Sequence, residues 1–153
     1  MPAAAAPPAV FCTRALDAQL QAAGTSATQF ATLFQAWQVA GEYSSPYFGK
    51  DGAYYGVKID NRDYLLRHVH LEPKQNTVQK AAWWKAWGRR ARKKSDTALV
   101  YTKDSRGRFL LIWILAEPDA HDYINRTEAK HIQAVNQYAK VAAAFLADGS
   151  IIG

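Results

Sequence analysis

The chain has 153 residues, of which 49% are hydrophobic and 21% charged, and it carries a formal net charge of +6. This length and composition predict one globular domain and exclude collagen-like and disulfide-scaffold proteins, while the positive charge favours a polyanionic partner. The longest apolar run, Phe109 to Ala116, spans about eight residues against the ~20 that a membrane helix needs, so we expect no membrane partner.

The beginning of the chain, residues 1–9, is rich in Ala and Pro and lacks the basic start and apolar stretch of a signal peptide. We expect these residues to form a disordered leader before a single domain at residues 10–148. The single cysteine, Cys12, cannot form an internal disulfide, which fits a reducing cytoplasm. Residues 10–16 fit either a short strand or the start of an Ala-rich helix.

A helix is predicted after Ser26, which has the spacing of a capping box to Gln29. Gly41 supplies a stop, and between the two signals apolar residues recur at helical spacing: Phe30, Leu33, Phe34, Trp37 and Ala40. Residues 41–61 are rich in Gly, Ser, Pro, Tyr and Asp, which predicts a loop with a brief strand near residues 54–58.

Further strands are predicted at residues 64–71, 97–102 and 108–116, and the last of these is apolar on both faces and therefore central. A short helix at residues 78–87, ended by Gly88, precedes the second of these strands, and an amphipathic C-terminal helix begins near Thr127. The order predicts an α+β fold, with an antiparallel sheet, helices mainly on one face and the other face left free to bind a partner.

His68 and His70 are the sharpest indication of chemistry. Residues two apart in a strand point to the same side, so both imidazoles are expected on one face and Arg67 on the other. Histidine changes charge near neutral pH, which suits acid–base chemistry or metal binding. Zinc needs a third ligand at a recognisable spacing, which is missing, so no metal and no cofactor are expected. The alternative is two hydrogen-bonded sheet residues without chemistry.

Other side chains give weaker indications. Tyr101 ends a predicted strand and can donate a proton or stack on a base, although packing is its commoner role. His121 follows the predicted central strand, where connecting loops often carry function. His131 lies in the predicted C-terminal helix and is expected to be solvated.

Between Lys74 and Lys94 the chain has eight Lys or Arg residues and no Asp or Glu. Tryptophans interleave with these cations, and aromatic rings stack on unpaired bases while Lys and Arg neutralise phosphates. At least one of Trp83 and Trp87 is expected to anchor a small helix on the core. The candidate RNA contacts of this segment are Lys85, Arg89, Arg90, Arg92 and Trp84.

With these segments in this order, the chain resembles the YafO family of mRNA interferase toxins, within the wider RelE/ParE group. The resemblance rests on VFCTRAL (10–16), YFGKDGAYY (47–55), RHVHL (67–71), ALVYT (98–102), LLIWILAEPDAH (110–121) and AKVAAAFL (139–146). The leader and the long Trp-rich basic stretch depart from the family pattern.

The resemblance implies a RelE-like fold, in which N-terminal helices and a C-terminal helix pack on a twisted antiparallel sheet, and it favours a strand at residues 10–16. It also implies a toxin that cleaves mRNA on the translating ribosome in the cytoplasm. A cognate antitoxin would neutralise it, and the charge of +6 predicts that the toxin-binding segment of this antitoxin is acidic.

The mechanism expected from these residues is metal-independent attack of the RNA 2′-hydroxyl on the adjacent phosphate. His68 or His70 is the expected general base or acid, with His121 or Tyr101 taking the complementary step. Asp51 is a candidate to orient a histidine. Three cations are candidates for stabilising charge on the phosphate: Lys50, Arg67 and Arg126.

Two other functions are compatible with the same sequence. One is a basic protein that binds RNA or the ribosome without catalysis. The other is a toxin of the ParE kind directed at DNA gyrase, which would share the fold but not depend on the histidines.

Overall fold

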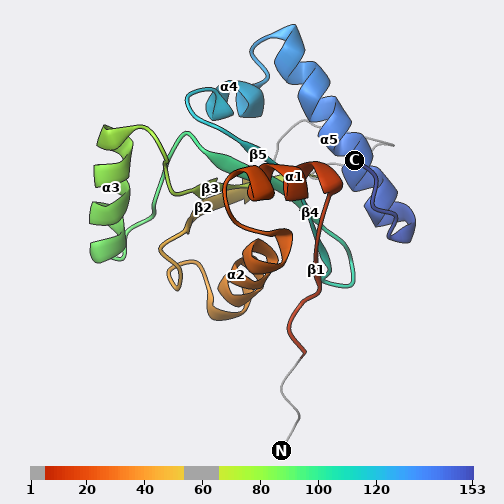
Figure 1. Cartoon of the computed structure of the whole chain (residues 1–153), viewed down its shortest axis with the longest axis horizontal. Helices are drawn as coiled ribbons and strands as arrows, with labels where there is room; N and C mark the ends of the chain where they lie inside the picture. The colour runs from red at the N-terminus through yellow and green to blue at the C-terminus, as the bar shows by residue number, and fades with distance from the viewer. Residues whose placement is uncertain (1–5, 54–65) are drawn as a thin grey trace, which may run out of the picture.

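The computed structural model describes residues 6–53 and 66–153 (Figure 1). One five-stranded sheet has the order β1-β5-β4-β3-β2, in which β1 pairs parallel with β5 and the other neighbours are antiparallel. The elements along the chain are β1 (Val10–Cys12), α1 (Arg14–Ala22), α2 (Ala27–Ala40), β2 (Phe48–Ala53), β3 (Arg67–Leu71), α3 (Thr77–Gly88), β4 (Ala98–Lys103), β5 (Phe109–Leu115), α4 (Ala120–Asn125) and α5 (Ala129–Asp148). The predicted α+β class, with helices before the sheet and a helix at the C-terminal end, is confirmed.

Helices cover both faces of the sheet, so the prediction that they lie mainly on one face is wrong. One core packs α1 and α2, through residues such as Leu16 and Phe34, against Leu99 of β4. A second core packs α5, through residues such as Val135, against Val100 of β4 on the opposite face. The reason is that β4 and β5 carry apolar side chains on both faces. Helices must therefore cover both faces to remove these side chains from water.

The two layers of helices do not cover the sheet evenly. The helix α5 packs on β4 and β5, whereas β2 and β3 lie at the other side of the sheet. The helix α3 lies at the opposite end of the molecule from α5 (Figure 1). On the face of the sheet that α5 packs against, β3 and β2 therefore extend beyond the helix, in the direction of α3. The histidines lie in this part of the sheet.

Most predicted elements are present, and their ends follow local signals. The Ser26 side chain accepts a hydrogen bond from the backbone N–H of Gln29 at 3.1 Å, and Gly41 ends α2 with a φ of +103°. Both predictions for residues 10–16, a short strand and the start of a helix, are met in part, because β1 is followed directly by a helix that Thr13 caps. The strand β5 lies inside the sheet between β1 and β4, as its apolar sequence predicts.

The strand β2 was missed, because FGKDGA reads as a loop. It forms by pairing with β3 on one side, while on the other the backbone N–H of Lys50 donates to the carbonyl of Lys93 at 2.8 Å. Gly49 permits this approach, since a Cβ there would lie 2.3 Å from the Lys93 carbonyl oxygen. The strand predicted near residues 54–58 and the start of the strand predicted at 64–71 lie outside the described residues.

The last residues of the leader already form hydrogen bonds with the domain before β1 begins. The carbonyl of Pro8 accepts from the Gln35 side chain at 2.7 Å, and that of Ala9 accepts from the backbone N–H of Phe109 at 2.9 Å. Residues 1–5 lie outside the described part. Across the described ranges, no helix combines the length and the apolarity that a membrane crossing needs.

Candidate functional site: a row of histidines

Three imidazole rings lie in a row on the face of the sheet that α5 packs against, beyond the two strands that this helix contacts. His68 and His70 share one face of β3, as strand alternation predicts, opposite Val100 and Ala98 of β4. Their ring centres are 6.1 Å apart. His121, in the first turn of α4, brings its ring to 5.5 Å from that of His70. We call His68, His70 and His121 the histidine row.

Burial keeps the two strand histidines neutral. His70 is only 5% exposed and His68 is half-buried. Burial lowers the pKa of His68 to about 4, with further lowering by His121 and Lys50 and opposition from Asp51. Burial also lowers the pKa of His70 to about 4, helped by His68, His121 and Lys50. Both rings are therefore uncharged bases at neutral pH.

These pKa values predict how folding stability depends on pH. An unfolded histidine titrates near 6.5, so between about pH 6.5 and 4 the unfolded chain binds protons that the folded chain rejects. The contribution of the two neutral histidines to the free energy of unfolding is therefore fully present above this pH window. It is lost as the pH falls through the window, by at most about 1.4 kcal/mol per pH unit for each histidine. Urea unfolding at pH 7, 6 and 5 measures the slope, and His70→Gln should reduce it. Equal stability of the wild-type protein at pH 7 and pH 5 would contradict the assignment.

His70 and His121 are held by consecutive residues, Ser95 and Asp96. The backbone N–H of Ser95 donates to Nδ1 of His70 at 2.9 Å. Oδ1 of Asp96 lies 2.8 Å from Nδ1 of His121 and accepts from its backbone N–H, also at 2.8 Å. Sequence reasoning missed Asp96, whose available signal was its place as the first acidic residue after the run of cations.

Asp51, Tyr101 and Arg67 form a separate cluster on the α2 face. The Tyr101 hydroxyl donates to Oδ1 of Asp51 at 2.6 Å and accepts from Nε of Arg67 at 3.2 Å, and Arg67 also pairs with Oδ2 of Asp51 at 3.0 Å. Burial, then Asp51, raises the pKa of Tyr101 far above its usual range. The carboxylate that was expected to orient a histidine thus holds Tyr101 and Arg67, and Arg67 lies on the face opposite the histidines, as predicted.

This arrangement predicts that Tyr101 acts in folding. Tyr101→Phe removes a buried hydroxyl from Asp51, and we expect it to lower the free energy of unfolding by about 1–2 kcal/mol. Since the hydroxyl faces away from the histidine row, activity per folded molecule should stay unchanged. Chemical unfolding and a toxicity assay corrected for folded protein measure the two effects. A loss of activity without a loss of stability would instead make Tyr101 a catalytic group.

Lys50 and Arg126 are the other two cations that the sequence predicts for the site. Lys50 lies near enough for its charge to lower the pKa of both His68 and His70. Arg126 ends α4, the helix that carries His121, with a left-handed φ of 55°.

His131, expected to be solvated, is in fact 2% exposed, because its ring caps the start of α5 by accepting from the Glu128 backbone N–H at 3.0 Å.

The basic segment divides into a structural part and an exposed part. Trp83 is fully buried and donates to the Pro46 carbonyl at 2.7 Å, which confirms that one tryptophan anchors α3. Lys93 is buried, with its ammonium 4.9 Å from the Trp87 ring centre, and burial lowers its pKa. Arg92 pairs with Glu42 at 2.9 Å.

The exposed part forms a surface over α3 and the turn after it. Trp84 is 40% exposed, with its indole N–H on Glu72 at 3.2 Å. Among the described residues, the cations of this surface have no acidic partner. We call it the α3 basic surface, and its cations are Lys80, Lys85, Arg89, Arg90 and Lys94.

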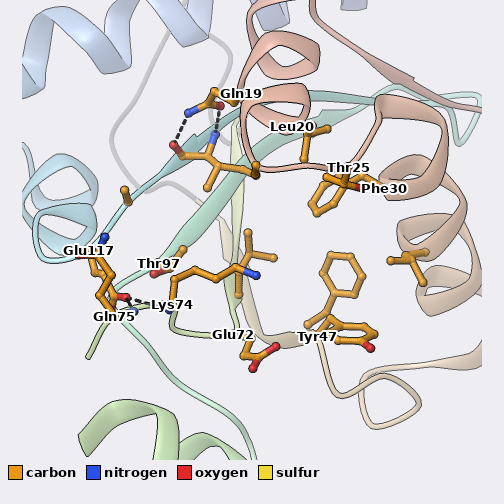
Figure 2. A pocket seen from close by; sticks show the side chains of 16 residues that line it. Gln19, Leu20, Thr25, Phe30, Tyr47, Glu72, Lys74, Gln75, Thr97 and Glu117 are labelled. Carbon is orange, nitrogen blue, oxygen red and sulfur yellow. Dashed lines mark hydrogen bonds between the residues drawn. The ribbon is translucent and has the colours of Figure 1, made fainter. Parts of the chain in front are cut away.

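An apolar pocket of about 480 Å³ opens on the other face, between α1, α2 and the sheet (Figure 2). Apolar side chains such as Leu20, Phe30 and Ile114 form much of its wall. One of its charged residues, Glu117, already accepts the backbone N–H groups of residues 74, 75 and 76. Among the described residues that line this pocket there is no histidine to transfer a proton, so the histidine row is the better candidate for the site. In the described ranges, no group of three or more His, Cys, Asp or Glu side chains is placed to hold a metal ion.

Comparison with known proteins adds one finding. The family model described as "Toxin YafO, type II toxin-antitoxin system" matches residues 35–147, which is more than half of the chain. The matched span contains the whole histidine row, Asp96 and the α3 basic surface. No curated protein and no solved structure matches the chain.

Proposed function

Because this chain belongs to the YafO family of type II toxin–antitoxin toxins, we propose that it is a ribosome-dependent mRNA endoribonuclease that blocks translation. Membership of the family makes it a toxin with a cognate antitoxin as partner. The observation that carries the proposal is the row of three imidazoles on one face of the sheet, where the charge of Lys50 reaches His68 and His70. Single buried histidines are common in cores, but three adjacent rings indicate proton transfer.

The reaction that suits these groups uses the nucleophile already present in RNA. A base removes the proton of the 2′-hydroxyl, and O2′ attacks the adjacent phosphorus. The bond from phosphorus to O5′ then breaks as an acid protonates O5′. The products are a 2′,3′-cyclic phosphate and a 5′-hydroxyl, and every proton is accounted for by two side chains.

The geometry favours particular residues for these steps. His68 suits the base, because it is neutral at pH 7 and less deeply buried than His70. His121 suits the acid, because its side chain is 53% exposed and belongs to the row, whereas Tyr101 lies on the other face. Lys50 is placed to stabilise charge on the phosphate. His70, between the other two, keeps their spacing.

The α3 basic surface supplies the binding part of the proposal. Its exposed cations neutralise phosphates of mRNA or ribosomal RNA, and the exposed Trp84 ring can stack on a base. These contacts place a translating message against the histidine row in the cytoplasm. In the neutralised complex, an acidic segment of the antitoxin compensates the same positive charge.

Mapping of new mRNA 5′ ends after brief expression tests the proposal. The wild-type protein should create new ends within coding regions and arrest growth, and a His68→Gln, His121→Gln double variant should do neither. Because the α3 basic surface also fits a non-catalytic RNA-binding protein, growth arrest without new ends would support that function and reject the nuclease. A DNA-damage response that is unaffected by loss of both histidines would indicate gyrase as the target.

A further inference from the structure

Two consecutive residues hold two members of the histidine row in opposite tautomers. The Ser95 backbone N–H donates to Nδ1 of His70, so the neutral His70 ring carries its proton on Nε2. The Asp96 carboxylate can only accept, so Nδ1 of His121 carries a proton and points to Asp96. The proton-transfer atom of His121 is therefore Nε2.

The backbone of Asp96 is itself held in place. Asp96 is 9% exposed, and its backbone N–H donates to Oε1 of Gln79 in α3 at 2.9 Å. Oδ1 binds both the ring and the backbone N–H of His121, so rotation of the imidazole away from Asp96 would break a bond at 2.8 Å. The contact fixes both the orientation of the ring and the start of α4.

We propose that Asp96 is the positioning residue of the nuclease: it binds the Nδ1–H of His121, so that the imidazolium form, which carries a second proton on Nε2, gives that proton to the leaving O5′ and returns to the neutral Nδ1–H tautomer. This inference rests on the proposed function for its chemical consequence. The tautomer of His121, which is the structural part of the inference, does not depend on that function. A carboxylate that holds a histidine in this way sets the tautomer and stabilises the imidazolium. Its replacement by an amide is expected to lower the rate strongly, because the amide can donate to Nδ1, which then cannot carry the proton that the imidazolium acid needs.

Asp96→Asn is the variant that tests the inference, and Asp119→Asn is its matched control. The control removes the same charge at the N-terminus of the same helix, from an exposed side chain that makes no capping hydrogen bond. Nitrogen-15 NMR of the imidazoles should show His121 protonated on Nδ1 in the wild-type protein and in Asp119→Asn. In Asp96→Asn we expect a shift towards the Nε2–H tautomer.

Cleavage of mRNA by purified ribosomes with each variant gives the second readout. We expect Asp96→Asn to lower the rate by about 10²–10⁴-fold per folded molecule, and Asp119→Asn to stay within about twofold of the wild type. An unchanged His121 tautomer in Asp96→Asn, or an unchanged rate, overturns the inference. Should the wild-type protein cleave no RNA while His121 carries its proton on Nδ1, the proposed function fails and the positioning of His121 by Asp96 stands. Loss of folded protein does not blur the result, because the tautomer is read only in folded molecules.

Discussion

Replacing His68 with glutamine should lower the rate of mRNA cleavage by about 10²–10⁴-fold, the usual contribution of one general base. Glutamine keeps a polar side chain of similar length in the same half-buried position, so the strand should still form. It cannot, however, accept the proton of the 2′-hydroxyl. The measurement is the rate of appearance of cleaved message on purified ribosomes, with folding checked by circular dichroism.

The remaining histidine provides the control for this prediction. His131 lies outside the row and caps α5, with its ring centre 4.5 Å from that of Tyr123. His131→Gln should lower stability by about 1–3 kcal/mol through the buried hydrogen bonds it disturbs, yet leave cleavage per folded molecule intact. If His68→Gln cleaves as fast as the wild type, His68 is not the base.

Neutralising Lys85, Arg89 and Arg90 together with glutamine should weaken binding to RNA by about 10–100-fold at low salt. Each cation that binds a phosphate releases counterions, so the slope of log affinity against log salt should become shallower by about 0.7–0.9 for each phosphate that is no longer neutralised. These side chains are exposed and lack acidic partners among the described residues, so stability should change little. Affinity for ribosomes at several salt concentrations measures the effect.

The matched control removes charge from the far end of the molecule. Lys130 and Lys140 are exposed on α5, away from α3, and their replacement by glutamine lowers the net charge without touching the α3 basic surface (Figure 1). This double variant should bind nearly as tightly as the wild type. If both variants weaken binding equally for each charge removed, binding follows net charge alone and α3 has no special part.

The elements with strong local signals were predictable from the sequence. Ser26 and Gly41 mark the two ends of α2, and the apolar runs of β4 and β5 identify strands inside the sheet. Strand alternation also placed His68 and His70 on one face and Arg67 on the other. In each case the information lies within a few neighbouring residues.

The features that were missed depend on contacts between distant segments. The strand β2 has the sequence of a loop and forms through pairing with β3 and with Lys93. His121 could be singled out, but its approach to His70 follows from the packing of α4. Asp96 holds His121, because residues 95 and 96 run beside both β3 and the start of α4, whereas the described hydrogen bonds of the Asp51 side chain go to Tyr101 and Arg67. No periodic pattern records such proximity.

The most direct test of the account is cleavage of a message whose 2′-hydroxyl has been removed at the mapped cleavage site. On purified ribosomes, the wild-type toxin should cut the all-ribose message to leave a 2′,3′-cyclic phosphate and a 5′-hydroxyl. It should leave the message with a single 2′-deoxy substitution intact at that position. Cleavage of the substituted message at the same rate would show that the attacking group is not the 2′-hydroxyl, and the assignment of the histidine row as its acid and base would be wrong.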